Sequence, residues 1–243
     1  MSKPITLSKT SIEQFMSGCN YKYPLYKKYT MKKMSPAMQF GIDVHQMLEE
    51  GVPQFANEDT IDIRVYEIAQ KLETMTNKLG YHILDREVKH IAPLTKDIQV
   101  FGIIDVVAEL DGEPVLIDYK TAAQTWKTVT TQEGELIVPK AVGFQGPIYL
   151  TTPYAGSSSD YWGDGLWPGE LHYLLAPTNG LTKVHKYYDN ATDRENLIQA
   201  ARQIKAAVDA GAFPKNRGWM CGQCDWKNVC YQTRDWRKYH EEK

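Results

Sequence analysis

The sequence predicts an α+β fold in which helices flank a mixed, mostly antiparallel sheet. Three observations predict it: apolar residues recur at helical spacing in the first third of the chain, alternating apolar segments surround an Asp-Gly turn in the middle, and a helix-capping pattern opens an amphipathic segment near the C-terminus. The length of 243 residues fits one large domain or two small ones. We expect a single domain over 1–243, made of a basic and aromatic N-terminal segment (1–34), a core (35–213) and a cysteine-rich C-terminal lobe (214–243).

Capping residues and apolar spacing predict the helices. Ser35 followed by Pro36 fits an N-cap and a first helical position, and Gly51 would end that helix. Ser8 or Thr10 would cap a shorter helix nearer the N-terminus. Apolar residues at helical spacing predict a further helix over 60–79, ended by Gly80. The other predicted helices end near residues 16, 50 and 210.

Thr192-Asp-Arg-Glu195 matches a capping box and should open the last of these helices. Alternating apolar residues between turn signals predict strands, which span 82–91, 98–110, 114–120, 170–176 and 182–188. The stretch 121–168 carries no clear period, and the glycines and serines at 156–165 indicate a loop.

The composition excludes membrane and secreted disulfide proteins. No apolar run approaches the ~18 residues of a membrane span, and the N-terminus has no apolar signal-peptide core. We therefore expect no membrane association and a cytoplasmic location, where the four cysteines stay reduced.

Positive charge gathers at the two ends of a chain whose net charge is −2. Residues 1–33 carry +6 and residues 214–243 carry +3, which leaves −11 for the stretch between them. If the ends meet, they form a basic face suited to a polyanion. Tyr21 and Lys22 belong to a run of interleaved tyrosines and lysines that would stack unpaired bases and hold phosphates. The alternatives are lysines that only keep the surface soluble and tyrosines that pack inward.

Two carboxylates are expected to face each other across a hairpin. Apolar strands flank Asp111-Gly112, a strong hairpin signal. With these two residues in the turn, Asp105 and Asp118 pair across the strands with Cβ atoms roughly 5 Å apart, and Lys120 shares the face of Asp118. Facing carboxylates repel unless a proton or cation neutralises them, and Mg²⁺ and Mn²⁺ prefer carboxylate oxygen. Two interpretations stay open: a metal site, or a surface hairpin in which Lys120 bridges both acids.

A histidine offers a further ligand. Gly41 and His45 are four residues apart in a predicted helix and so share one face. His45 would supply an imidazole while Gly41 lets another segment approach; the alternative is a histidine that is merely packed or exposed.

Four short motifs follow one another along the chain: Gly41-x3-His45, Gly102-Ile-Ile-Asp105, Asp118-Tyr-Lys120 and Gln145-x3-Tyr149. In this order they resemble the motifs of RecB-like nucleases of the PD-(D/E)XK superfamily. The resemblance implies a restriction-endonuclease-like core in which a mixed sheet is flanked by helices.

The same resemblance implies roles for the motif residues. His45, Asp105 and Asp118 would be ligands for Mg²⁺ or Mn²⁺, and Lys120 would orient or deprotonate the attacking water and stabilise the charge that develops on the phosphate. Gln145 and Tyr149 resemble a helix motif that supports the site. Ile104 stands where the superfamily name has proline, and Pro147 should begin the helix, with Gln145 just before it.

Four cysteines suggest one closed site. Cys221, Cys224 and Cys230 form C-x2-C-x5-C, and Cys19 lies at the other end of the chain. Zinc accepts four thiolates, but its usual second spacing is two to four residues; an iron–sulfur cluster accepts a wider range. The pattern is similar to that of RecB-like nucleases with a [4Fe–4S] cluster, which include CRISPR-associated single-strand exonucleases and AddB-type nuclease subunits. The resemblance implies a [4Fe–4S] cluster that joins the N- and C-terminal segments, with structural zinc as the alternative.

The implied activity is metal-dependent hydrolysis of DNA, as a single-strand exonuclease of 5′→3′ polarity with some endonuclease activity. It would act in recombination, repair or CRISPR adaptation, with single-stranded DNA as substrate, a recombination, helicase or CRISPR-adaptation protein as partner, and room for oligomerisation. The alternative is a non-catalytic DNA-binding or assembly subunit of a nuclease or helicase–nuclease complex. No G-x4-G-K-[ST] loop is present, so any motor would be another chain.

Overall fold

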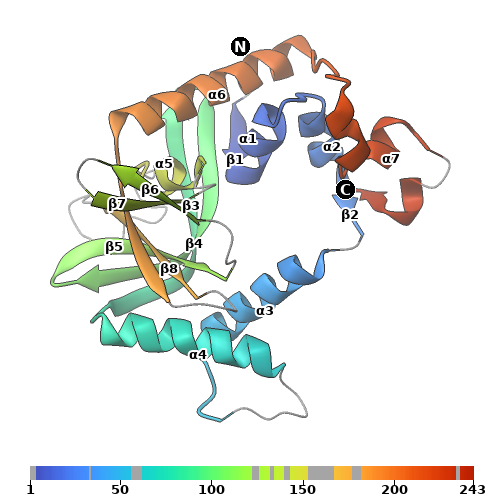
Figure 1. Cartoon of the computed structure of the whole chain (residues 1–243). Helices are drawn as coiled ribbons and strands as arrows, with labels where there is room; N and C mark the ends of the chain where they lie inside the picture. The colour runs from blue at the N-terminus through green and yellow to red at the C-terminus, as the bar shows by residue number, and fades with distance from the viewer. Residues whose placement is uncertain are drawn as a thin grey trace.

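A six-stranded mixed sheet lies at the centre of the computed structural model (Figure 1). The structure describes residues 4–32, 34–55, 62–121, 126–131, 134–139, 143–152, 167–176, 182–233 and 236–243. The strands of the sheet are β1 (Ile5–Ser8), β3 (His82–Thr95), β4 (Ile98–Leu110), β5 (Glu113–Lys120), β8 (Glu170–Leu175) and β9 (Lys183–Tyr188). Their order is β1-β4-β5-β8-β9, with β3 also paired to β4; β1 with β4 and β5 with β8 run parallel, and the other pairs are antiparallel. The predicted fold class is confirmed.

Helices cover both faces of this sheet (Figure 1). On one face lie α3 (Pro36–Glu50) and α4 (Ile63–Lys78), whose apolar residues pack against β4 and β5 around Leu72 and Ile117. On the other face lie α1 (Lys9–Met16), α5 (Gln145–Tyr149) and α6 (Ala191–Ala210), which pack around Ile12, Leu116 and Ile204. Two apolar cores therefore hold the sheet between them.

The capping residues set the ends of the first helices as the sequence predicts. The Ser8 side chain accepts from the Ser11 N–H at the start of α1, and the Ser35 side chain accepts from the Met38 N–H at the start of α3. Gly51 follows α3 with φ +93°, a backbone conformation that favours glycine. The expected start of the next helix, near residue 60, lies outside the described residues, and α4 begins at Ile63 behind the N-cap Asp62.

The Asp-Gly hairpin is confirmed with its register. Asp111 and Gly112 have φ +54° and +83°, the positive values of a type I′ turn. Leu110 pairs with Glu113, and the ladder continues to Val106 opposite Ile117. Each pair matches the two-residue turn that the sequence predicts.

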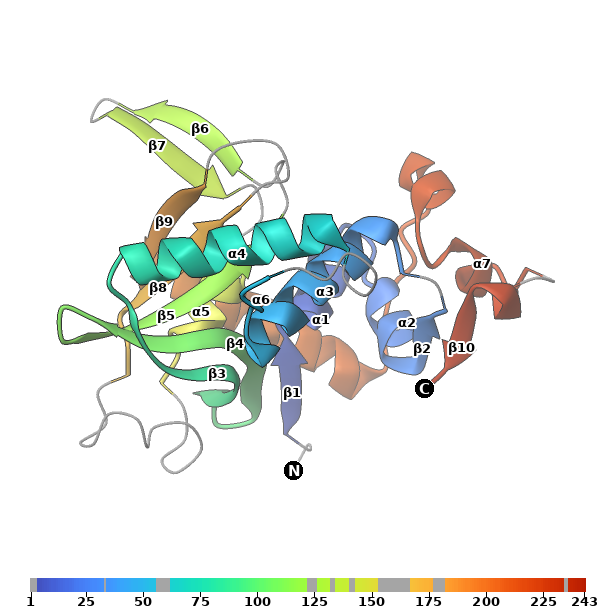
Figure 2. The same cartoon turned by 90° about the horizontal axis from the view of Figure 1, so that it is seen from below.

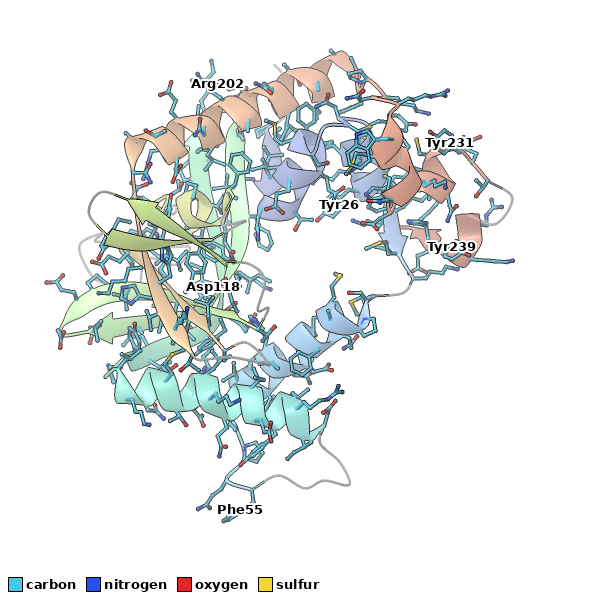
Figure 3. The ribbon with its side chains drawn as sticks, viewed as in Figure 1. Tyr26, Phe55, Asp118, Arg202, Tyr231 and Tyr239 are labelled. Atoms are coloured by element: carbon cyan, nitrogen blue, oxygen red, sulfur yellow. The ribbon has the colours of Figure 1, made fainter. Side chains whose placement is uncertain are left out.

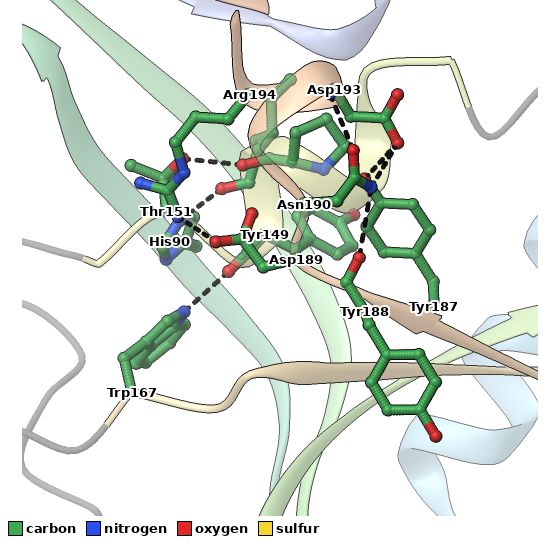
Figure 4. Close-up of polar contacts among 12 residues, drawn as sticks. His90, Tyr149, Thr151, Trp167, Tyr187, Tyr188, Asp189, Asn190, Asp193 and Arg194 are labelled. Atoms are coloured by element: carbon green, nitrogen blue, oxygen red, sulfur yellow. Dashed lines mark hydrogen bonds and ion pairs between the residues drawn. The ribbon is translucent and has the colours of Figure 1, made fainter.

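Several elements differ from the sequence-based prediction. β1 and the helix α2 (Lys22–Lys28) are absent from it, because four- and seven-residue elements carry too little periodicity. The capping box at Thr192–Glu195 is wrong: Asn190 is the N-cap of α6, and its side chain accepts from the Asp193 N–H (Figure 4). The expected loop at 156–165 lies outside the described residues, and the β6–β7 hairpin (Trp126–Thr131, Gly134–Pro139) falls in the stretch without a clear period.

The two basic ends of the chain meet beside the core. β2 (Tyr29–Met31) pairs antiparallel with β10 (His240–Glu242), and α2 and α7 (Lys227–Cys230) lie next to this pair in both views (Figures 1 and 2). Trp226 donates from Nε1 to Gln14 Oε1 at 2.9 Å, so side-chain contacts also tie the C-terminal lobe to α1. The basic segment around α2, with Lys22, Lys27 and Lys28, therefore lies beside the basic C-terminal lobe, an arrangement that the polyanion hypothesis expects.

Among the described helices, none is long and apolar enough to cross a membrane.

Candidate active site

The site forms where one edge of β4 changes its partner. β1 pairs with Ile98–Phe101 of β4, whereas β5 pairs with Val106–Leu110. Asp105 lies at the end of the interval between them, and its Oδ2 accepts a hydrogen bond from the backbone N–H of Tyr119 at 2.7 Å. The carboxylate thus takes the place of a ladder contact and is held where β4 and β5 separate.

α3 brings an imidazole to this carboxylate. His45 Nδ1 lies 3.4 Å from Asp105 Oδ2. Burial opposes a charge on His45, but the hydrogen bond to Asp105 and the charges of Asp105 and Asp118 outweigh it and raise the pKa of His45 to about 9. A Cβ at Gly41 would make an ordinary contact, 3.6 Å from Thr121 Oγ1, so the approach of another segment does not require glycine there.

Glu87 on β3 completes a group that sequence reasoning missed. Its neighbours Arg86 and Val88 pair with Val106 and Ile104, so Glu87 lies opposite Asp105. One ligand atom each from His45, Glu87 and Asp105 lies within 4.8 Å of the other two.

The backbone of Glu87 is unusual. Its φ of +51° is rare for a residue other than glycine, and such residues cluster at functional sites. Burial, followed by the charge of Asp105, raises its pKa. In the sequence Glu87 is one of several charged residues on a predicted strand, and only its pairing with Asp105 distinguishes it.

Asp118 and Lys120 form a pair next to this group. Asp118 is 1% exposed, its Oδ2 contacts Lys120 Nζ and its Oδ1 accepts from Gln145 Nε2. Burial raises the pKa of Asp118, whereas the charge of Lys120 lowers it. For Lys120, burial opposes the charge, but Asp118 and Asp105 outweigh it and raise the pKa. Lys120 is therefore a cation at neutral pH, and the carboxylate of Asp118 is engaged by Lys120 and Gln145.

The short helix α5 contacts the site through Gln145, which donates to Asp118. Gln145 is its first residue and Pro147 its third, so the expected order with Gln145 before the helix is corrected by two positions. The Tyr149 hydroxyl donates to the carbonyl of Ile103, in the interval of β4 between its two partners. A Cβ on Gly102 would lie 2.4 Å from the Tyr149 ring, so glycine is needed for this approach.

His90 and Trp167 hold the end of α5 (Figure 4). His90 donates from Nε2 to the carbonyl of Ile148 at 3.0 Å, and Trp167 donates from Nε1 to the carbonyl of Tyr149 at 2.7 Å. The two rings stack with centroids 5.0 Å apart. These donors satisfy carbonyls that the end of a helix leaves without partners.

We expect His90 to make stability depend on pH. Burial lowers its pKa to about 4, whereas an unfolded histidine has a pKa of about 6.5. The unfolded chain therefore binds more protons between these values, so His90 contributes fully above about pH 6.5, and about 3 kcal/mol of unfolding free energy is lost as the pH falls toward 4. His90→Phe keeps a ring against Trp167 but cannot titrate, so urea denaturation should show a shallower pH dependence than wild type. The exposed His82→Phe is the control, and an unchanged slope in His90→Phe would contradict the assignment.

The four cysteines line one cavity of about 330 Å³ between the N-terminal segment and the C-terminal lobe. Cys19 comes from the turn before α2, and the others from the segment around α7, namely Cys221, Cys224 and Cys230. The backbone N–H of Gly218, followed by the hydroxyl of Tyr231, lowers the pKa of Cys221. Tyr231 lines the same cavity, and Figure 3 shows it in a lobe that lies away from Asp118.

Tyr21 and Lys22 line this same cysteine cavity. The Tyr21 ring packs against the small apolar cluster of Leu25, Trp226 and Val229, and Lys215 Nζ lies 4.3 Å from its centroid. One face of Tyr21 is thus covered by a cation, which places this ring in the packing of the lobe.

Comparison with protein families identifies the class of protein that this fold belongs to. Residues 6–231 match the model of the PD-(D/E)XK nuclease superfamily. The match spans most of the chain, so the chain belongs to this superfamily, and the sheet flanked by helices is consistent with its restriction-endonuclease-like fold.

A solved structure shares this fold. A candidate exonuclease from Eubacterium rectale superposes with a TM-score of 0.55 at 13% identity, covering 94% of this chain and 88% of that one. The structure of SSO0001 gives a TM-score of 0.47 at 12% identity, covering 95% and 88%. No curated protein matches the sequence.

Proposed function

We propose that the chain is a divalent-metal-dependent deoxyribonuclease whose centre comprises His45, Glu87, Asp105, Asp118 and Lys120. One observation carries the proposal: a buried carboxylate–lysine pair lies beside a His–Glu–Asp group at the point where β4 and β5 separate. Membership of a nuclease superfamily supports the reaction class.

Mg²⁺ or Mn²⁺ fits the donors that the structure brings together. Glu87 and Asp105 offer carboxylate oxygens, which both ions prefer, and His45 offers an imidazole nitrogen. The raised pKa of Glu87 reports burial beside like charge, a condition that a bound cation relieves. These three residues would hold the ion, with Asp118 as a further ligand on the adjoining strand. When bound, the ion would polarise the scissile phosphate and make a water more acidic.

Lys120 would act through its charge. Its ammonium group contacts Asp118, and 27% of the Lys120 side chain is exposed, so the residue is anchored by a buried carboxylate and still reaches the surface of the site. From this position it would orient the attacking water and stabilise the negative charge that develops on the phosphate. Gln145 donates to the carboxylate of Asp118, and this carboxylate holds Lys120. The helix α5 therefore has a positioning role.

The proposed substrate is single-stranded DNA, degraded as an exonuclease in the 5′→3′ direction during recombination, repair or CRISPR adaptation. The family resemblance and the basic region formed by the two chain ends support this substrate. The E. rectale neighbour, itself named as a candidate exonuclease, agrees with action at ends. A helicase or recombination protein is the corresponding partner.

The test uses anaerobically purified full-length protein with single-stranded DNA labelled at either end, in Mn²⁺, Mg²⁺ or EDTA. Metal-dependent release of label that is lost in Asp118→Ala supports the proposal, and the end released first gives the polarity. Asp111→Asn, in a turn that accepts asparagine, is the matched control. DNA binding without cleavage in any metal would overturn the proposal.

Glu87→Gln tests the ligand that the structure adds. Loss of one carboxylate should raise the Mn²⁺ concentration for half-maximal cleavage by at least about 10-fold. This is the lower end of the effect seen when a residue that only hydrogen-bonds to a metal ligand is mutated, and a direct ligand should matter at least as much. Stability without metal should hold or rise, because the variant removes repulsion with Asp105. Glu109→Gln on β4 is the control. An unchanged metal requirement would remove Glu87 from the ligand set.

We further propose that the four cysteines bind a [4Fe–4S] cluster. A zinc ion with Zn–S bonds of about 2.3 Å needs its sulfurs about 3.8 Å apart. All four cysteines are described, yet no three of their sulfurs lie within 4.8 Å of one another. That spread favours a cluster over a single ion, and Lys22, Lys215 and Arg217 nearby suit its negative charge.

A further inference from the structure

A cavity of about 880 Å³ opens directly beside His45, Glu87 and Asp105. Its volume lies within the range of about 300–1,000 Å³ that holds small organic ligands. α3 forms one wall, and β3 and β4 form the other. The reacting phosphate must therefore share this space with the rest of its nucleotide.

One part of the cavity is apolar although it is open to solvent. Met38 and Ile42 of α3 are 50% and 45% exposed, and Ile103 of β4 is 40% exposed. Met38 and Ile42 are one helical turn apart and precede His45 on the same side of α3, and Ile103 is two residues from Asp105 on the same strand. Apolar side chains thus face each other across the cavity, next to the proposed ligands.

The C-terminal end of the α3 wall is acidic. Glu49 and Glu50 follow His45 toward the C-terminal end of the helix and also line the cavity. These carboxylates repel a phosphate backbone. The opposite, apolar end of α3 is its N-terminal end, on the side of β2 and the basic lobe (Figure 1). Charge therefore favours a strand that reaches the site from the Met38 end.

We infer that Met38, Ile42 and Ile103 contact the face of an unpaired base next to the scissile phosphate, so that this cavity selects single-stranded nucleic acid. The inference rests on the proposed nuclease function and adds the group that is recognised. Aliphatic side chains suit a base face of any sequence, because every base has an apolar π-face. In a duplex both faces are stacked on neighbouring pairs, so paired bases cannot enter.

The experiment removes a base from the DNA in one arm and the apolar side chains of the cavity in the other. Single-stranded oligonucleotides carry one abasic nucleotide at successive positions, and cleavage by wild type is compared with Met38→Ser/Ile42→Ser and with Ile103→Thr. Wild type should lose about 10-fold in kcat/KM where the abasic residue flanks the scissile bond, the scale of one base contact. Each variant should lose a similar factor on intact DNA and little more on abasic DNA. Ile63→Ser, an equally exposed apolar residue on α4, should behave as wild type.

Measurements of DNA binding test the base contact independently of the nuclease proposal. Fluorescence anisotropy in Ca²⁺ measures intact and abasic single strands without cleavage. If no substrate is cleaved, the nuclease proposal fails, yet weaker binding of abasic DNA by wild type and equal binding by the variants still supports the base contact. If wild type cleaves and binds abasic and intact strands equally, the base contact is wrong and the nuclease proposal stands.

Discussion

Lys120→Met is expected to lower the rate of DNA cleavage by about 10²–10³-fold, the loss typical when one preorganised charge is removed from a developing anion. Binding of single-stranded DNA in Ca²⁺ should change little, because the charge at stake is one ammonium group against the large basic surface of the chain ends. Single-turnover cleavage with end-labelled DNA measures the first effect, and anisotropy measures the second.

The structure predicts a separate effect of Lys120→Met on stability. Asp118 is almost wholly buried and would lose its cationic partner, a situation that typically costs about 3–5 kcal/mol. Asp118→Asn in the same chain removes the unpaired charge, so the double variant should be more stable than Lys120→Met while both remain inactive. This pattern separates the catalytic role from the structural one.

Lys71→Met, on the exposed face of α4, is the matched control and should keep wild-type activity and stability. If Lys120→Met cleaved DNA at the wild-type rate, the lysine would be only a partner for a buried acid. Asp105, Glu87 and His45 would then have to act without it.

Local chemistry explains which parts of the fold could be predicted. The hairpin register follows from Asp111 and Gly112, because both residues must take positive φ and few other pairs do so. Ser35, Pro36 and Gly51 likewise encode the ends of α3 in single residues. The sequence did not identify Asn190 as the N-cap, because Thr192–Glu195 offers a second capping pattern two positions later. Tertiary contacts decide between the two: Asn190 and Tyr187 both donate hydrogen bonds to the Asp193 carboxylate (Figure 4).

The residues of the site likewise fall into those that local sequence predicts and those that it does not. Asp105, Asp118 and Lys120 could be placed together because one short turn determines their register. The position of Glu87 could not be predicted, because it depends on the register of β3 against β4, which the sequence does not specify. The clamp of His90 and Trp167 on α5 joins residues far apart in the chain and leaves no local signal.

Cys230→Ser is expected to remove the visible absorbance of an iron–sulfur cluster and to lower the melting temperature of the protein. The lobe has a very small apolar core, in which Leu25, Trp226 and Val229 are the buried members among the described residues. So small a core needs a covalent cross-link or a bound metal to stay folded. The free energy of metal binding then contributes directly to the free energy of folding. Residues before α2 and around α7 would separate once one ligand is lost.

The size and location of this effect distinguish it from that of Lys120→Met. Metal analysis of the anaerobic wild type should find iron, and Cys230→Ser should lose it. Asp225→Asn, an exposed change between Cys224 and Cys230, should retain both iron and stability. Below its melting transition Cys230→Ser should keep more nuclease activity than Lys120→Met, because the cysteines contribute no side chain to the group at Asp105. Unchanged melting and absorbance would exclude the cluster, and stoichiometric zinc in the wild type would replace it with the single-ion site.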